Sequence, residues 1–211
     1  MYEKVKKEIQ DICKDLVKEG LIAGSAGNVS ARVENHVVIT PSQKHYDKMK
    51  FEDVMVLDMD GNVIEGTMNP SSETPTHLEV YRHRTDVFAV IHTHSIYATA
   101  MAILHKSLPP VIDEVTARLG GEIRVTRYAQ PGSTDLGRAV VEAIDMRSGV
   151  LIANHGVLCC DRTLRDAFDD ALLLERACRI YLSALPHGEP VPIPEDVLES
   201  EGDIWRIIKG V

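Results

Sequence analysis

The chain has 211 residues, of which 44% are hydrophobic and 26% are charged, and its formal net charge is −9 at pH 7. This length and composition are typical of one domain with a sizeable core, and the negative charge argues against non-specific nucleic-acid binding. No apolar run in the sequence is long enough to span a membrane, and the charged N-terminus lacks the apolar region of a signal peptide. We therefore expect a cytoplasmic protein that binds neither nucleic acid nor membranes.

The four cysteines, Cys13, Cys159, Cys160 and Cys178, form no C-x-x-C motif. They are too few for the disulfide framework of a small secreted domain. We expect them to be reduced and mostly buried.

The first thirty residues predict a helix followed by a loop of small residues. Apolar residues recur at helical spacing over residues 5–17, and Gly20 is the expected residue just beyond the helix end. Residues 24–30 read Gly-Ser-Ala-Gly-Asn-Val-Ser and open into a strand. Backbone N–H groups in such a loop can approach an anion closely, and Ser25 and Asn28 add side-chain donors. An ordinary turn is the alternative.

Residues 36–65 predict three strands. The first covers residues 36–40 and runs into Thr40-Pro41-Ser42-Gln43-Lys44. The other two, residues 54–57 and 62–65, flank Asp60-Gly61, a strong signal for an antiparallel hairpin. Lys44 is either a charged partner for an anion or a solvated lysine.

Residues 71–74, Ser-Ser-Glu-Thr, lead into a predicted helix that carries His77. Ser71 or Ser72 could cap this helix, and Glu73 could favour its positive end. A helix N-terminus also suits an anion for the same electrostatic reason, so the roles are compatible.

A buried strand with two histidines at its exit is the central feature of the sequence. Residues 87–91 are an apolar run, and His92 and His94 follow with one residue between them. In an extended chain, residues i and i+2 project to the same face, so both imidazoles can reach one point. An H-x-H pair is also common without a metal, and spacing alone does not decide.

A third histidine interrupts two apolar runs downstream. Asn154-His155-Gly156 separates residues 150–153 from residues 157–160, both predicted strands. A polar group there is costly unless it is satisfied, and a metal would satisfy His155. Three neutral imidazoles and a carboxylate suit a catalytic zinc ion. The candidate metal ligands are His92, His94, His155 and Glu73.

The remaining segments predict mostly helices. We expect helices at residues 96–104, 113–119, 135–144 and 164–185, with a strand at residues 123–128 and a turn with a helix cap at residues 131–134. His83 and His105 have no partner spacing and are expected on helical segments at the surface. The predicted domain ends at residue 185. The tail, residues 186–211, either closes over a site or lies on the surface.

The motifs together resemble those of the class II aldolase/adducin family, over nearly the whole chain. The matching segments are residues 24–30, 40–42, 71–73, 92–95 and 154–157. The resemblance implies an α/β fold, a single domain with a central, mainly antiparallel sheet flanked by helices. It also implies a bound Zn²⁺, with Mn²⁺ or Co²⁺ as alternatives, and a homotetramer with its sites at subunit interfaces.

The same resemblance implies roles for individual residues. Glu73 would leave the metal to act as a base, and Glu114 of a neighbouring subunit would exchange a proton with an aldehyde oxygen. The residues implied to hold phosphate are Ser25, Asn28, Ser42, Ser71 and Ser72. Two positions depart from the family: Gln43 replaces a glycine that helps to cradle the phosphate, and Asp113 and Glu114 stand where a tyrosine is the proton donor.

The implied reaction is zinc-dependent aldol cleavage or formation. A sugar 1-phosphate of the L-fuculose 1-phosphate type would give dihydroxyacetone phosphate and a small aldehyde through a metal-stabilised enediolate. Three alternatives remain. Glu114 favours a methylthioribulose-1-phosphate dehydratase, while Thr40 and Glu73 disfavour a pentulose-phosphate 4-epimerase. A non-catalytic adducin-like interaction module is disfavoured by the complete histidine and glutamate set.

Overall fold

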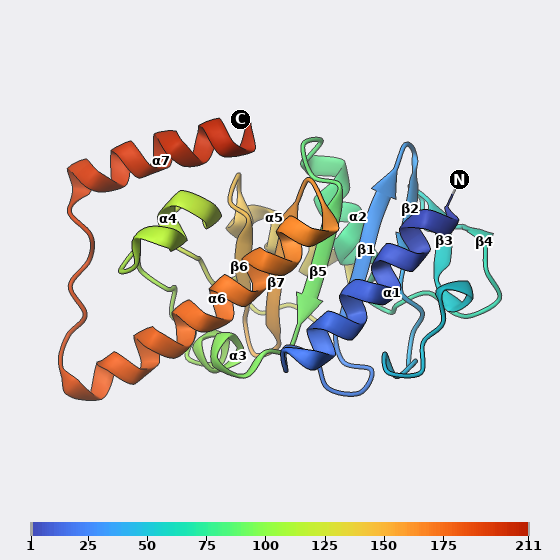
Figure 1. Ribbon diagram of the computed structural model, residues 1–211, viewed down its shortest axis with the longest axis horizontal. Helices are drawn as coiled ribbons and strands as arrows, with labels where there is room; N and C mark the ends of the chain where they lie inside the picture. Colours follow the sequence, from blue (N-terminus) through green and yellow to red (C-terminus); the bar gives the residue numbers. More distant parts are fainter. Residues whose placement is uncertain (1, 211) are drawn as a thin grey trace.

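The centre of the computed structural model, which describes residues 2–210, is a seven-stranded sheet with the order β4-β3-β2-β1-β5-β7-β6 (Figure 1). The strands are β1 (Asn28–Val33), β2 (His36–Ile39), β3 (Met55–Asp58), β4 (Val63–Glu65), β5 (Ala89–Thr93), β6 (Gly149–Ile152) and β7 (Gly156–Asp161). Every neighbouring pair is antiparallel. The predicted antiparallel sheet and the hairpin of β3 and β4 are therefore confirmed.

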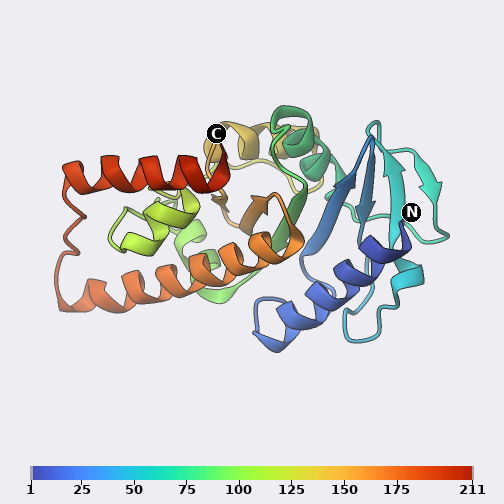
Figure 2. The same cartoon turned by 45° about the horizontal axis from the view of Figure 1, so that its top comes forward.

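Helices cover both faces of the sheet (Figures 1 and 2). They are α1 (Glu3–Lys18), α2 (Thr74–His83), α3 (Ile96–Ile103), α4 (Asp113–Leu119), α5 (Thr134–Ile144), α6 (Leu164–Ala184) and α7 (Glu195–Lys209), with short 3₁₀ turns at Phe51–Asp53 and Leu185–His187. The first face carries α1, α3, α4 and α6, and the second carries α2 and α5. Because side chains alternate along a strand, β2, β3, β5 and β7 each contribute to both cores.

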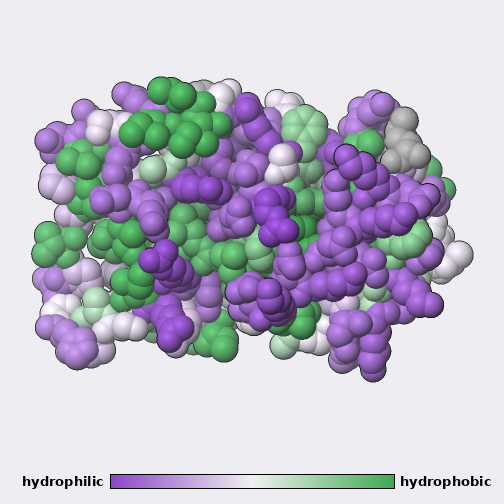
Figure 3. All heavy atoms as spheres, in the orientation of Figure 1, coloured by the Kyte–Doolittle hydropathy of each residue, from purple (hydrophilic) through white to green (hydrophobic). Residues whose placement is uncertain are grey.

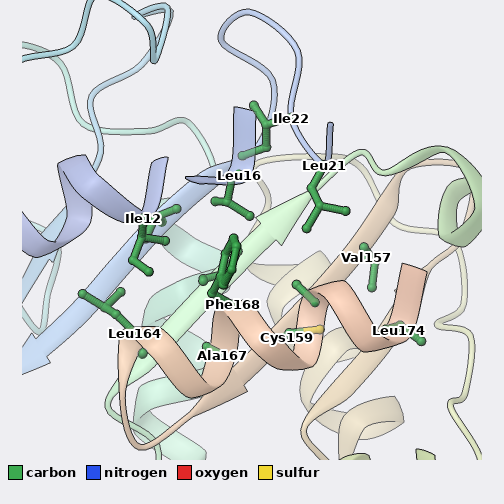
Figure 4. Packing of buried hydrophobic residues seen from close by; sticks show 14 of the residues in the cluster. Ile12, Leu16, Leu21, Ile22, Val157, Cys159, Leu164, Ala167, Phe168 and Leu174 are labelled. Atoms are coloured by element: carbon green, nitrogen blue, oxygen red, sulfur yellow. The ribbon is translucent and has the colours of Figure 1, made fainter. Parts of the chain in front are cut away.

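The larger core lies between the sheet and the helices α1 and α6. Figure 4 shows Leu16 of α1 and Phe168 of α6 packed together over the sheet. Neighbouring strand residues serve different cores: Cys159 belongs to this one, whereas Cys160 faces the core beneath α2 and α5. All four cysteines are free and buried, as expected.

Two predicted helix ends are confirmed in detail. Gly20 follows α1 with φ +74°, and the N–H of Leu21 donates to the carbonyl of Leu16 at 2.9 Å. This geometry favours glycine because the left-handed region costs a residue with a Cβ atom. At α5, the Ser133 hydroxyl accepts the N–H of Leu136 at 3.1 Å.

The predicted strand at residues 123–128 is wrong. Ile123 forms an isolated bridge with Leu108, and Val125 forms another with Leu151. The segment is hydrogen-bonded to two different partners over a few residues, so no continuous ladder forms. The alternating apolar pattern reflects burial between neighbours rather than membership of the sheet.

The tail contains a helix that the sequence did not lead us to expect. α7 packs against α4, with Trp205 only 7% exposed and in contact with Gly120. Figure 3 shows a hydrophobic patch where this helix lies, and its exposed apolar residues include Ile204, Ile207 and Ile208. Among the described residues, no helix combines the length and apolar character needed to cross a bilayer.

Candidate metal centre and anion pocket

The ends of β5 and the turn between β6 and β7 bring the three histidines together. His92 lies on β5, between Asn28 of β1 and Leu158 of β7 in the sheet, and His94 follows the strand end. The turn before β7 carries His155 close to them. Gly156 permits this approach, because a Cβ atom there would collide with the carbonyl oxygen of Thr93.

The three histidines form a compact cluster. Their ring centroids are 4.7 to 4.9 Å apart, and one ligand atom from each ring lies within 4.8 Å of the others. Glu73, which immediately precedes α2, lies beside them. Its Oε1 atom lies 3.2 Å from His155 Nε2, and its Oε2 atom lies 3.4 Å from His92 Nε2. The four predicted ligands therefore lie together.

The protonation states suit a cation. Burial, helped by the neighbouring histidines, lowers the pKa of His92 to about 3, and burial together with His155 lowers the pKa of His94. Burial raises the pKa of Glu73, but a hydrogen bond from His155 and the nearby imidazoles outweigh it and bring the pKa to about 2. Neutral imidazoles beside an ionised carboxylate are the donors that a divalent metal requires.

Hydrogen-bond accounting supports the same conclusion. His92 Nδ1 lies 2.9 Å from the carbonyl oxygen of Val157, which only accepts, so Nδ1 carries the proton and Nε2 keeps its lone pair. That Nε2 faces His94 Nε2 at 3.0 Å. Glu73 Oε2 and His155 Nδ1 are buried without a hydrogen-bond partner in the described chain. The unsatisfied Glu73 oxygen and the free Nε2 lone pair of His92 fit a bound metal ion.

A pocket of about 160 Å³ adjoins the cluster. Its lining residues are Ser25, Ala26, Gly27, Asn28, Pro41, Ser42, Gln43, Ser71, Ser72, Glu73, His92 and His94. Every residue predicted to hold phosphate is therefore beside the candidate metal ligands. Larger hollows elsewhere, one of about 530 Å³ near Tyr2 and Glu65, lack such a set of side chains.

Backbone hydrogen bonds fix the two loops that meet in this pocket. Ser42 N–H donates to Asn69 O at 2.9 Å, and Ser71 N–H donates to Thr40 O at 3.1 Å. Neither Ser71 nor Ser72 is the N-cap of α2: that position is Glu73, and Ser71 Oγ accepts its N–H at 3.2 Å. The serines therefore shape the turn before the helix, and its N-terminus opens beside the pocket.

The residue that departs from the family pattern keeps a glycine-like backbone. Gln43 has φ +57°, in the left-handed region that glycine occupies without strain. Lys44 does not line the pocket and pairs with Asp53 at 3.0 Å. The loop thus keeps a backbone conformation typical of glycine although Gln43 carries a side chain. Lys44 pairs with Asp53 instead of facing the pocket.

Glu114 is not brought to the pocket within one chain. It is exposed at the start of α4 and pairs with Arg176 of α6 at 3.4 Å. Its predicted role in a neighbouring subunit's site stays a prediction.

Two other histidines differ from what the sequence suggested. His105 lies beyond α3 with φ +52°, and its Nε2 is 2.5 Å from Asn154 Oδ1; the helical placement is wrong because the chain reverses there. His77 was not singled out, yet it is fully buried behind the pocket and contacts Asn28 and Ser30. Its position four residues after Glu73 was the available signal, because such residues share a helix face.

The chain is similar to known proteins over most of its length. The family model described as class II aldolase and adducin N-terminal domain matches residues 7–182. A 5-deoxy-D-ribulose 1-phosphate aldolase from Bacillus thuringiensis is 38% identical, covering 95% of this chain and 94% of the relative. An L-fuculose phosphate aldolase from Escherichia coli is 34% identical over 92% and 89%. A solved L-fuculose 1-phosphate aldolase superposes with a TM-score of 0.93 at 36% identity, covering 96% of each chain.

Proposed function

Because the chain belongs to the class II aldolase and adducin family, we propose that it is a metal-dependent aldolase acting on a sugar 1-phosphate. In this proposal it cleaves or forms the bond between dihydroxyacetone phosphate and a small aldehyde. The observation that carries the proposal is that one pocket is lined both by candidate metal ligands and by small and hydroxyl residues suited to a phosphate. The metal end and the anion end of such a substrate could be held at once.

The proposed metal is Zn²⁺, held by His92, His94, His155 and Glu73, with Mn²⁺ or Co²⁺ as alternatives. When bound, the ion would supply Lewis-acid polarisation of the ketone next to the bond that changes. The ionised Glu73 carboxylate and the lowered pKa values of His92 and His94 support this assignment.

Glu73 is the proposed base. In the synthetic direction its carboxylate takes a proton from the hydroxymethyl carbon of dihydroxyacetone phosphate, that carbon bonds to the aldehyde carbon, and the aldehyde oxygen receives a proton. Glu73 suits this role because its ionised carboxylate lines the pocket and its Oε2 has no hydrogen-bond partner in the described residues. Glu114 of a neighbouring subunit is the proposed donor of the last proton.

The phosphate end is assigned to one group of residues, Ser25, Asn28, Ser42, Ser71 and Ser72. They supply hydroxyl and amide donors beside the N-terminus of α2, where backbone N–H groups and the helix dipole favour an anion. No lysine or arginine lines this pocket, so neutral donors would carry the binding.

The aldehyde is proposed to have two or three carbons. The relatives are named for a five-carbon and a six-carbon sugar phosphate. Dihydroxyacetone phosphate accounts for three carbons of either substrate, which leaves a two-carbon or a three-carbon aldehyde.

A homotetramer with sites between subunits is the proposed assembly. The exposed Glu114 and the exposed apolar residues of α7 leave surface available for neighbours. Sedimentation equilibrium would test the stoichiometry, and a monomeric active enzyme would contradict the role of Glu114 in a neighbouring site.

The second candidate function is dehydration of a methylthioribulose 1-phosphate. Glu114 favours it, because a carboxyl group there could serve acid–base chemistry where the aldolases use a tyrosine. Release of water without carbon–carbon cleavage would distinguish this reaction.

The deciding experiment is hydrogen exchange at the hydroxymethyl carbon of dihydroxyacetone phosphate in deuterated water. We expect exchange with metal-loaded protein and none after chelation, with Glu73→Gln as the inactive comparison. Absence of exchange by metal-loaded wild-type protein would refute the aldolase proposal and leave the dehydratase as the first reaction to assay.

A further inference from the structure

A buried chain of four side chains leads from α2 to the floor of the anion pocket. The Tyr81 hydroxyl lies 2.8 Å from Ser30 Oγ, which lies 2.6 Å from His77 Nδ1. His77 Nε2 lies 2.5 Å from Asn28 Oδ1. Tyr81, Ser30 and His77 are at most 1% exposed, and Asn28 lines the pocket.

Tyr81, at the buried end of this row of side chains, sets the direction of the hydrogen bonds. Ser30 Oγ is the only acceptor that the Tyr81 hydroxyl contacts in the described residues, so Tyr81 donates to it. The Ser30 hydrogen is then free to be donated to His77 Nδ1. A neutral imidazole that accepts at Nδ1 carries its proton on Nε2, which donates to Asn28 Oδ1.

Burial supports the neutral ring. It lowers the pKa of His77 to about 4, because desolvation penalises the imidazolium form. A cationic ring would donate from both nitrogens, and either the Ser30 or the Tyr81 hydroxyl hydrogen would then have no acceptor among these four side chains.

The direction fixes how Asn28 meets the pocket. Its oxygen is occupied by His77, so the amide N–H groups are the atoms that remain for the pocket side. We propose that His77 is a positioning residue that holds the Asn28 amide with its donors toward the anion. The reversed amide would present an oxygen to a phosphate and repel it. The inference rests on the proposed function only in assigning phosphate to this pocket.

The location of His77 ties the two halves of the site together. Its N–H donates to the carbonyl of Glu73 at 3.4 Å, and its partner Asn28 pairs with His92 across β1 and β5. Fixing Asn28 through His77 therefore aligns an anion donor with the elements that carry the candidate metal ligands. A donor that is already oriented costs less ordering when the ligand binds.

Binding of inorganic phosphate to the metal-loaded full chain, measured by titration calorimetry, tests this inference without turnover. We expect His77→Leu to weaken phosphate binding about tenfold to a hundredfold, the loss typical of one hydrogen bond to a charged group. His77→Gln should retain most of the affinity, since its amide can still donate to Asn28. Thr76→Val, the matched control at a buried neighbouring position, should bind phosphate like the wild type.

A double-mutant cycle identifies the route of the effect. If His77 acts through Asn28, His77→Leu should cause no further loss in an Asn28→Ala background. Equal losses in both backgrounds would overturn the inference, and so would unchanged binding by His77→Leu. Should the leucine variant not fold, His77→Asn replaces it, because its shorter amide can reach Ser30 but not Asn28.

Two further results separate this inference from the proposed reaction. If the enzyme is an aldolase, His77→Leu should raise KM for the sugar phosphate more than it lowers kcat. If no aldol activity is found, the phosphate titrations still decide the role of His77. A wild-type protein that binds no phosphate at millimolar concentration would overturn both the anion pocket and the positioning role.

Discussion

Buried ionisable groups lie at both ends of the β5 and β7 strand pair. At one end their polar atoms lack partners, whereas at the other end they form ion pairs within the chain. At one end, His92, His94 and His155 converge on Glu73 and leave acceptor atoms without partners. At the other end Asp161 stands opposite Ala89, the first residue of β5, and pairs with Lys209 of α7. Lys209 also lies 3.1 Å from the fully buried Asp170.

At the Lys209 end, the buried carboxylates are paired with cations of the protein itself. Arg118 reaches the second oxygen of Asp170 at 3.0 Å, so two cations face two carboxylates. Burial raises the pKa of Asp170 to about 7, which shows how dependent its charged form is on these partners. The histidine end has no such internal cation among the described residues. Buried polar groups that find their partners within the chain stabilise the fold, whereas buried polar groups without partners indicate a ligand.

The largest expected effect is on the reaction at the histidine cluster. Glu73→Gln keeps the size of the side chain but removes the base and a metal ligand, so kcat should fall by about 10²- to 10⁴-fold. Steady-state aldol assays on metal-loaded protein measure this. Glu79→Gln, within α2 and outside the pocket, is the control and should remain active. A Glu73→Gln enzyme of normal kcat would remove Glu73 from the mechanism.

At the Lys209 end, we expect substitutions to lower the free energy of unfolding rather than the activity. Lys209→Met leaves Asp161 and Asp170 without their shared cation, and breaking a buried pair in this way costs about 3–5 kcal/mol of unfolding free energy. Urea unfolding measures the loss, and Lys18→Met, at an exposed lysine, is the control. Adding Asp170→Asn should recover part of the stability, because it removes one of the two buried carboxylates that Lys209 contacts. A loss no larger than that of Lys18→Met would show that α7 does not depend on this contact.

Metal removal should separate the two ends directly. A ligand present at one hundred times its dissociation constant stabilises the folded state by about 2.7 kcal/mol, so chelation should lower the melting temperature and added Zn²⁺ should restore it. Calorimetric melting with and without chelator measures the shift. Lys209→Met should keep this response, whereas His155→Ala should lose it. An equal shift in His155→Ala would place the responding metal elsewhere.

The smallest effect is expected at Gln43. Gln43→Gly relieves the left-handed backbone but adds freedom to the unfolded chain, and these contributions offset to within about 1 kcal/mol. Because the backbone conformation is already present, phosphate affinity should be unchanged. Thermal melting and phosphate titration measure both quantities. A large gain in affinity would mean that the Gln43 side chain obstructs the pocket.

Local patterns in the sequence were enough to predict several elements. The Asp60-Gly61 hairpin, the end of α1 at Gly20 and the Ser133 cap each depend on a few neighbouring residues. The two-residue alternation of a strand likewise places His92 and His94 on one side of β5. These features could be predicted because their geometry is fixed by backbone sterics and short-range hydrogen bonds.

Assembly of the site required both the motif resemblance and the fold. Glu73, His92 and His155 lie far apart in sequence, and no local periodicity places Glu73 within 3.4 Å of both histidines. The strand predicted at residues 123–128 failed for the related reason that a ladder needs a continuous partner.

The sequence by itself determined the chemistry available to this protein: three histidines and a glutamate in recognisable motifs, small residues for an anion, and the strand that presents them. Only the tertiary structure decided that His77 lies behind Asn28 and that Lys209 reaches Asp161 and Asp170. Each of these contacts joins residues about forty to fifty positions apart in the sequence. Their existence depends on how helices dock on the sheet, which is set by the packing of the whole core rather than by any local pattern.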